Sequence, residues 1–357
     1  MALQFEEIRI KEVRKETAQC VSILFDIPPP LAGAFAYQAG QYVTLRAFIN
    51  GEDVRRSYSL CSSPLENEWR VAVKKVDGGL FSTFANDQLK AGDTIELMPP
   101  LGNFHPALNP QNRKHYIGIA AGSGITPVIS IIKTVLSTEP NSSFTLVYGN
   151  RNRHSIIFKE ELDALKNKHI HRFNIIHVLS REMTDATINH GRINAEKCAC
   201  LFEKALNINA DEFFICGPEE MTLGIKAFLM DNAVTEEKIR IELFTTGNEK
   251  TRVKHETLKP EEEPKSKITI KLDGVSFDFE LAFEDESILD AAAHNGADVP
   301  YSCKSGVCCT CRAKLLEGEV EMDACYGLEP EEIKAGYILT CQSHPTTERV
   351  VVDYDAK

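Results

Sequence analysis

Apolar and polar residues alternate in short runs along the first third of the chain. These runs cover residues 8–16, 20–27, 41–49, 69–76 and 93–100, and turn residues separate them. A period of two between turn residues is typical of antiparallel strands in a barrel or sandwich. We therefore predict an antiparallel β-barrel domain over residues 1–110.

Near residue 110 the pattern changes to strands that alternate with helices. The strand-like runs are HYIGIA, FTLVYG, FNIIHVL, EFFICG and IRIELF. After the first run, apolar residues recur at helical spacing, at Val128, Ile131, Ile132, Val135 and Leu136. Such alternation predicts a parallel sheet covered by helices on both faces, in an α/β domain over residues 111–245.

A polar stretch separates this part from the end of the chain. Residues 246–266 hold few apolar side chains and many charged residues, Thr and Pro, so we predict a linker there. Residues 267–357 form a third domain. They contain 18 acidic and 8 basic residues and so carry −10 of the net charge of −12. This charge argues against nucleic-acid binding, and it favours either solubility or steering toward a basic partner.

The composition, with 43% hydrophobic and 26% charged residues, is that of an ordinary globular protein. No secretory signal and no membrane-spanning run is visible in the sequence, so we expect a cytoplasmic protein without a membrane partner. Eleven cysteines in such a protein favour metal binding over disulfides.

The predicted strands of the α/β domain end in residues that suit a phosphate. In AAGSGITP, Gly122 and Gly124, on either side of Ser123, allow a close approach of the backbone because they lack Cβ. Thr126 can cap the next helix, and Pro127 suits its first position. The positive end of that helix would then face an anion. A tight strand–helix turn without a ligand is the alternative.

Two further strand ends carry compatible chemistry. Ser180 and Arg181 in VLSRE can share a phosphate, although a solvated arginine is common at such a place. CGPEEM places Cys216 and Gly217 at a strand end and Pro218 at the start of a helix, and a buried cysteine there is often only a small apolar residue. Together, the three strand ends favour nucleotide binding.

In the barrel, RRSYS combines an arginine for a phosphate, a tyrosine that can stack on a planar ring and a serine that can hydrogen-bond to it. Composition alone does not single these residues out. However, RSYS, GGLFS, PPLGNF, GSGITP and CGPEEM, in this order and spacing, resemble the ferredoxin–NADP reductase superfamily over about residues 1–245.

The resemblance implies FAD in the barrel, with Arg56 at the flavin phosphate, Tyr58 on the isoalloxazine and Ser59 near N5. The other flavin-site residues that it implies are Ser57, Val73, Lys74, Lys75, Phe81, Ser82 and Thr83.

In the α/β domain, the resemblance implies that residues 122–127 hold the pyrophosphate of a nicotinamide cofactor. Cys216, Gly217, Pro218 and Met221 would then lie by the nicotinamide, and Phe244 would cover the flavin ring. Members that prefer NADPH place a Ser-Arg pair like Ser180-Arg181 at the 2′-phosphate, so we expect NADPH rather than NADH. For hydride transfer we expect Ser59, Cys216 and Glu242 to be the catalytic residues.

The stretch CKSGVCCTC holds four cysteines in nine positions. C-x4-C-x2-C with a distant fourth cysteine is the spacing of plant-type [2Fe–2S] proteins, whereas structural zinc usually takes two short pairs. Residues 267–357 also resemble plant-type ferredoxins, which implies an α+β β-grasp fold and a [2Fe–2S] cluster on Cys303, Cys308, Cys311 and Cys341. Cys309 would not be a ligand, and Cys325 is a second candidate for the fourth position.

The predicted cofactors together would convert two-electron hydride chemistry into one-electron transfer. The domain order is that of several oxygenase reductases. The run CYGLEPEEIKAGYILTCQSHPTTERVVVDYD, with YGNR and VLSRE, is similar to the reductase components of phenylacetyl-CoA epoxidases, so we expect the subunits of a di-iron epoxidase as acceptors. The alternatives are a reductase for a Rieske-type aromatic-ring or steroid oxygenase, possibly with FMN and NADH, and a redox-sensing or carrier protein.

Overall fold

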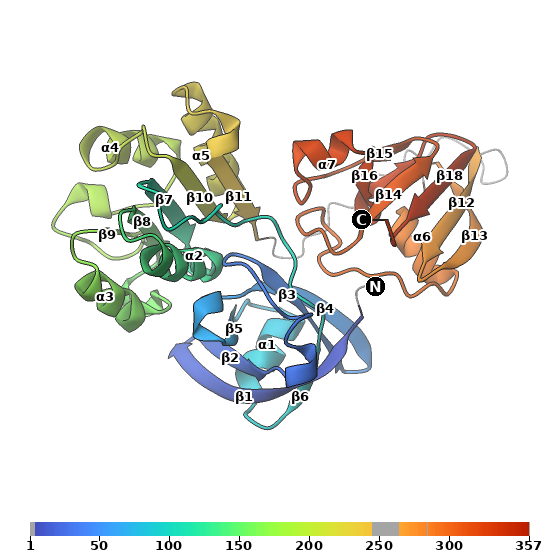
Figure 1. The fold of residues 1–357 in the computed structure, drawn as a ribbon, viewed down its shortest axis with the longest axis horizontal. Coiled ribbons are helices and arrows are strands. Elements are labelled where there is room, and N and C mark those ends of the chain that lie inside the picture. Colours follow the sequence, from blue (N-terminus) through green and yellow to red (C-terminus); the bar gives the residue numbers. More distant parts are fainter. Residues whose placement is uncertain (1–3, 245–263, 284, 357) are drawn as a thin grey trace. The chain divides into compact units, whose positions relative to one another are not determined.

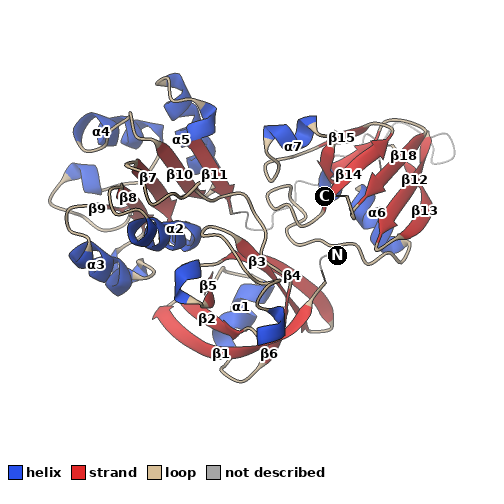
Figure 2. Cartoon of the chain, in the orientation of Figure 1, coloured by secondary structure: helices blue, strands red, loops and turns tan. Residues whose placement is uncertain are grey.

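The computed structural model describes residues 4–244, 264–283 and 285–356 (Figure 1). It confirms the predicted fold class, because an antiparallel sheet, a parallel α/β sheet and a mixed sheet follow one another along the chain (Figure 2). Most of the predicted linker, residues 246–266, lies outside the described residues, and β12 already begins at Lys265. No helix in the described ranges is long and apolar enough to cross a membrane.

Six strands form the N-terminal barrel, in the order β4-β3-β6-β1-β2-β5. They are β1 (Glu6–Thr17), β2 (Cys20–Asp26), β3 (Tyr42–Ile49), β4 (Glu52–Ser59), β5 (Trp69–Lys74) and β6 (Thr94–Leu97). A bridge between Leu60 and Val71 joins the chain just past β4 to β5 and so closes the sheet. Helix α1 (Leu80–Asp87), which the alternating pattern does not predict, buries Phe81 and Ala85 in the barrel core.

The α/β part has a parallel sheet of order β11-β10-β7-β8-β9. Its strands are β7 (His115–Ala121), β8 (Ser143–Asn150), β9 (Phe173–Leu179), β10 (Glu212–Gly217) and β11 (Ile239–Leu243). Its helices are α2 (Ile125–Thr138), α3 (Lys159–Lys168), α4 (Ala195–Lys204) and α5 (Glu219–Asp231).

Both faces of this sheet are covered, as predicted (Figure 1). One core joins α2 and α3 to residues such as Tyr116 and Phe214, and the other joins α4 and α5 to their neighbours Ile117 and Phe213. Adjacent strand residues point to opposite faces, so each strand is apolar on both sides.

The strand order reverses at β7, which lies between β8 and β10. Chain connections leave the sheet in opposite directions on the two sides of this point, and the ends of β7 and β10 therefore border a crevice where ligands bind in such folds. GSGITP follows β7 and CGPEEM begins within β10, so the two motifs lie at the same switch point.

The C-terminal domain is built on a five-stranded mixed sheet, β13-β12-β18-β14-β16, and a separate pair, β15 and β17. Its elements are β12 (Lys265–Leu272), β13 (Val275–Ala282), α6 (Ile288–His294), β14 (Arg312–Glu317), β15 (Val320–Met322), α7 (Pro330–Lys334), β16 (Tyr337–Leu339), β17 (Ser343–Pro345) and β18 (Arg349–Asp353). The central strands β12 and β18 pair in parallel. Helix α6 packs on the sheet through Ile288, Leu289, Ala291 and Ala292. The cysteine-rich stretch is the loop between α6 and β14.

Candidate functional site

The three predicted catalytic residues lie together where the barrel meets the parallel sheet. Ser59 is the last residue of β4, and Cys216 on β10 is the register partner of Glu242 on β11. Ser59 Oγ donates a hydrogen bond of 3.0 Å to Oε2 of Glu242, and Cys216 Sγ lies 3.8 Å from the same oxygen. A hydroxyl, a thiol and a carboxyl group thus form one cluster beside the switch point.

Burial dominates the electrostatics of this cluster. It raises the pKa of Glu242 to about 7, although hydrogen bonds from Ser59 and Cys216 oppose the shift. Burial, followed by the nearby Glu242 carboxylate, also raises the pKa of the Cys216 thiol well above its usual value. Near neutral pH, therefore, Glu242 exchanges a proton while Cys216 stays a thiol.

The loop after β7 differs in one respect from the sequence prediction. A 3-10 turn, η3 (Gly122–Gly124), leads directly into α2, so the helix begins at Ile125, before Thr126. Thr126 is therefore not the cap: its hydroxyl donates to the Ser123 carbonyl at 3.0 Å. Pro127 lies in the first turn but not at its first position.

Close backbone packing explains one glycine of this loop. A Cβ atom at Gly124 would lie 2.1 Å from the carbonyl oxygen of Cys216. The GSGITP loop and the end of β10 are thus in direct backbone contact, and the switch point tolerates no side chain at residue 124.

A lysine from the barrel reaches the same loop. A Cβ atom at Gly122, whose φ is +56°, would lie 3.1 Å from Nζ of Lys74. Burial, and then the charge of Arg151, lower the pKa of Lys74. Within the described parts of the chain, no carboxylate forms an ion pair with Lys74. The adjacent Lys75, in contrast, binds both carboxylate oxygens of Asp87, at 2.8 and 2.5 Å.

Ser180 and Arg181 follow β9, and they lie beside Arg151 and Arg153, which follow the neighbouring strand β8. The amide groups of Ser180 and Arg181 donate to the carbonyl groups of Asn150 and Arg151, at 2.9 and 2.8 Å. Glu182 accepts hydrogen bonds from the amide, at 2.8 Å, and the side chain of Arg153. Sequence reasoning missed Arg151 and Arg153, although RNR directly follows the run FTLVYGN and so marks a strand end.

The barrel residues predicted for the flavin lie on β4, β5 and α1. Arg56, Ser57 and Tyr58 belong to β4, and the Tyr58 ring lies 5.5 Å from that of Phe81, centroid to centroid. The side chains of Val73 and Phe81 are buried in the barrel core.

The start of α1 fits a phosphate. Ser82 and Thr83 lie in its first turn, and Gly79 precedes the helix without any side-chain cap. The amide groups of residues 80–82 have no partner within the helix and remain available to an anion, whereas the Thr83 amide donates to the Gly79 carbonyl at 3.0 Å. An aromatic face, the Ser59 hydroxyl and this helix start are a suitable set for a flavin nucleotide.

Other predicted nucleotide-site residues surround the switch point. Gly217 ends β10, Pro218 precedes α5, and a Cβ at Gly217 would contact the Met221 methyl group. The Phe244 amide donates to the Gly217 carbonyl at 3.3 Å, so the end of β11 is tied to the same loop.

Four cysteines converge in the C-terminal domain. The sulfur atoms of Cys303 and Cys308 are 3.1 Å apart, and the Cys341 thiol interacts with those of Cys303 and Cys311. Cys341 comes from a short turn, η7 (Thr340–Gln342), 30 positions after Cys311. Hydrogen bonds from Cys308 and Cys341 lower the pKa of Cys303, and the Ser305 amide adds another at 3.4 Å. Four convergent thiols, one of which accepts a hydrogen bond from a backbone amide, fit a four-thiolate cluster.

The backbone of the loop that carries three of these thiols packs closely against residues 324–327. Gly306, at φ +71°, would bring a Cβ to 2.7 Å from the Ala324 carbonyl, and a Cβ at Gly327 would lie 2.7 Å from that of Cys308. The segment that contains Cys325 thus packs against the backbone of the cysteine loop.

Three family matches follow the same division of the chain. The oxidoreductase FAD-binding domain matches residues 8–105, the oxidoreductase NAD-binding domain residues 119–227, and the 2Fe-2S iron-sulfur cluster binding domain residues 270–346. Over 354 residues, 99% of this chain and 98% of the relative, the chain is 43% identical to one of the subunits of 1,2-phenylacetyl-CoA epoxidase of Escherichia coli K12.

The chain belongs to the iron–sulfur flavoprotein reductases of multicomponent oxygenases. This reductase is also 33% identical, over 97% of its length and 96% of the relative's, to the ferredoxin reductase component of 3-ketosteroid-9-alpha-monooxygenase from Rhodococcus rhodochrous. The structure of phthalate dioxygenase reductase shares its fold over 98% of both chains, with a TM-score of 0.59 and 24% identity. The reductase is therefore an NAD(P)H-dependent flavin oxidoreductase with FAD and a [2Fe–2S] cluster, and it donates electrons to an oxygenase component.

Proposed function

We propose that this reductase takes electrons from NADPH and delivers them to the oxygenase subunits of a phenylacetyl-CoA epoxidase. The observation that carries the proposal is the 43% identity to the matching component of such an epoxidase over nearly the whole of both chains, against 33% for the ketosteroid monooxygenase reductase. The preference for NADPH rests on Ser180 and Arg181, which follow β9; the Arg181 amide donates to the carbonyl group of Arg151, which follows the neighbouring strand β8.

In this proposal each motif has one task. When bound, the flavin takes up two electrons as hydride, and the [2Fe–2S] cluster carries one electron at a time. Arg56, Ser57, Tyr58 and the first turn of α1 hold the flavin. The loop 122–127 binds the pyrophosphate of NADPH. Lys74, which the family resemblance implies at the flavin, is instead proposed at this pyrophosphate, because its ammonium group lies beside Gly122. Cys303, Cys308, Cys311 and Cys341 hold the cluster.

The protonation state of Glu242 determines in which direction the Ser59 hydroxyl group donates its hydrogen bond. When Glu242 is ionised, Ser59 Oγ donates its proton to Oε2. When Glu242 is protonated, the carboxyl group can donate to Ser59, and the serine proton is free to point elsewhere. Because the pKa of Glu242 is about 7, both arrangements are populated near neutral pH. Cys216, held on the same carboxyl, orients that group from the nucleotide side.

Reconstitution tests the proposal. The purified reductase is combined with the oxygenase subunits of a phenylacetyl-CoA epoxidase or with a ketosteroid monooxygenase, and product formation is followed with NADPH or NADH. We expect product only with the epoxidase, and a higher kcat/KM for NADPH. Turnover of the steroid oxygenase without epoxidation would reject the acceptor, and equal kcat/KM for both nucleotides would reject the NADPH preference.

A further inference from the structure

Helix α2 carries a buried polar face that the sequence does not suggest. Of its fourteen residues, Ser130, Lys133 and Thr134 are 0, 9 and 3% exposed. They are spaced i, i+3 and i+4, so they share one face of a helix that is otherwise largely apolar. A buried lysine requires partners, and these partners show what the face is for.

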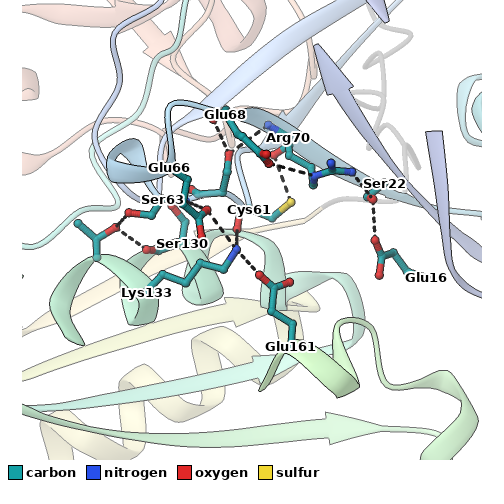
Figure 3. A network of polar contacts seen from close by, with 12 residues as sticks. Glu16, Ser22, Cys61, Ser63, Glu66, Glu68, Arg70, Ser130, Lys133 and Glu161 are labelled. Carbon is teal, nitrogen blue, oxygen red and sulfur yellow. Dashed lines mark hydrogen bonds and ion pairs between the residues drawn. The ribbon is translucent and has the colours of Figure 1, made fainter. Parts of the chain in front are cut away.

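The partners belong mainly to the barrel segment that directly follows β4. Ser130 Oγ donates to the Ser62 carbonyl at 2.6 Å, and Thr134 Oγ1 lies 2.8 Å from Ser63 Oγ. Lys133 Nζ donates to the Cys61 carbonyl at 3.3 Å. We call Ser130, Lys133 and Thr134, with residues 61–66, the α2 seam (Figure 3).

Two carboxylates complete the surroundings of Lys133. Glu66 lies at 3.4 Å and also accepts a 2.8 Å hydrogen bond from the Ser63 amide, while Glu161 reaches Lys133 from α3 (Figure 3). Burial lowers the pKa of Lys133, but Glu161 and then Glu66 raise it by more, so the lysine is charged. A single ammonium group therefore joins the barrel, α2 and α3.

The seam lies between the two proposed binding sites. Residue 61 comes two positions after Ser59, and Ser130 lies six residues after Gly124, about 9 Å along the helix axis. The segment 59–66 is thus attached to the α/β domain at two places. Ser59 binds Glu242 on strand β11, and residues 61–66 bind helix α2. Movement at the seam would shift the nucleotide loop relative to Ser59.

We infer that Lys133, together with Ser130 and Thr134, is a positioning residue group that sets the distance between the nucleotide loop and the flavin side of the barrel for hydride transfer. The inference rests on the hydride-transfer part of the proposed function and is independent of the oxygenase acceptor. Because misplacement of reacting atoms by about 1 Å can cost 10²-fold in rate, a loosened seam should reduce the rate of transfer far more than nucleotide affinity.

The test compares Lys133→Met with a buried-core control variant. Leu201→Ala is the control, because Leu201 on α4 is fully buried in the same domain but belongs to the core on the face of the sheet opposite α2. Stopped-flow absorbance measures flavin reduction by NADPH and by NADH without any oxygenase. We expect Lys133→Met to lower the rate constant at saturating nucleotide at least about tenfold, with less than about a threefold change in Kd. Leu201→Ala should lower Tm and leave the rate constant near that of the wild type.

Amide hydrogen exchange of the FAD-loaded protein supplies a readout that does not depend on turnover. Lys133→Met should speed exchange in residues 59–63 and in the first turns of α2, and Leu201→Ala should not. If Lys133→Met does not fold, Ser130→Ala/Thr134→Val removes the hydroxyl contacts with little change in volume and takes its place. If the seam variant has a lower Tm but an unchanged reduction rate constant and unchanged exchange in residues 59–63, the seam only stabilises the fold. Failure of the epoxidase reconstitution would leave this result unaffected.

Discussion

Ser59 Oγ donates a 3.0 Å hydrogen bond to Glu242 Oε2, across 183 positions of sequence. The bond joins the last residue of a barrel strand to an edge strand of the parallel sheet. The cluster of Ser59, Cys216 and Glu242 therefore exists only when both domains are folded and in contact.

The carboxyl group of Glu242 should make stability depend on pH. Its pKa is about 7 in the folded protein, against 4.5 for an ordinary glutamate, so the folded state binds more protons between these values. Stability should consequently fall as pH rises from 4.5 to 7 and then level off. The pKa shift corresponds to a change of at most about 3 kcal/mol in the free energy of unfolding. The actual change should be smaller, because solvent still reaches part of the Glu242 side chain.

Glu242→Gln removes this contribution, so the variant should gain stability relative to the wild type as pH rises. Urea denaturation at pH 5 and pH 8, with excess FAD in every sample, measures the difference. A difference between the two proteins that stays constant with pH would contradict the assignment.

Two adjacent lysines should behave differently toward the nucleotide. Lys74→Met should weaken NADPH and NADH about equally, by about tenfold, because Lys74 faces the loop proposed for the pyrophosphate that both share. Lys75→Met should leave the Kd of both nucleotides within about twofold, because Asp87 holds the Lys75 ammonium group. The dependence of the stopped-flow flavin-reduction rate on nucleotide concentration gives both constants. Equal losses in the two variants would remove Lys74 from the nucleotide site.

The cysteine loop should tolerate one serine substitution and not another. Cys309→Ser should keep the visible absorbance and the iron content of the wild type. Cys341→Ser should lose the cluster or alter its spectrum, because the Cys341 thiol is one of the four that converge. Cys325→Ser is the further control, and a bleached Cys309→Ser or Cys325→Ser protein would overturn the ligand assignment.

Two glycines offer a matched test of the switch point. Gly124→Ala places a Cβ 2.1 Å from the Cys216 carbonyl oxygen, and backbone on both sides cannot move without cost. We expect a loss of about 1–3 kcal/mol in the free energy of unfolding. Gly224→Ala, in α5, meets no atom within 4 Å and should stabilise by up to about 1 kcal/mol. Thermal denaturation of both variants checks the contrast, and an undisturbed Gly124→Ala protein would contradict the close contact.

Local pattern accounts for the architecture. The change from a period of two to strand–helix alternation near residue 110 predicts the parallel sheet, because strands covered on both faces must be apolar throughout. Strand ends such as GSGITP and CGPEEM predict a shared crevice, because parallel strands end at one edge. Helix α1 is missed because it has only eight residues and follows two glycines, which in sequence suggest a loop.

What depends on distant contacts could not be predicted. Lys133 stands among apolar residues of α2, and only the fold shows that it meets Cys61, Glu66 and Glu161. The expected cap at Thr126 is wrong because the preceding 3-10 turn extends the helix toward Gly124, a choice that local propensity does not determine. The direction of the Lys74 side chain likewise follows from how the barrel meets the sheet.

The parallel pairing of β12 with β18 joins the first and last strands of the C-terminal domain. During synthesis, β12 leaves the ribosome about eighty residues before its parallel partner β18 has been translated. We expect the barrel and the parallel sheet to fold in that interval, whereas the sheet beside the cysteine loop is complete only when β18 pairs with β12 and β14. We therefore expect cluster insertion to follow translation of almost the whole chain, and a chain truncated shortly before residue 349 to accept hydride but to lack a stable cluster that takes up single electrons.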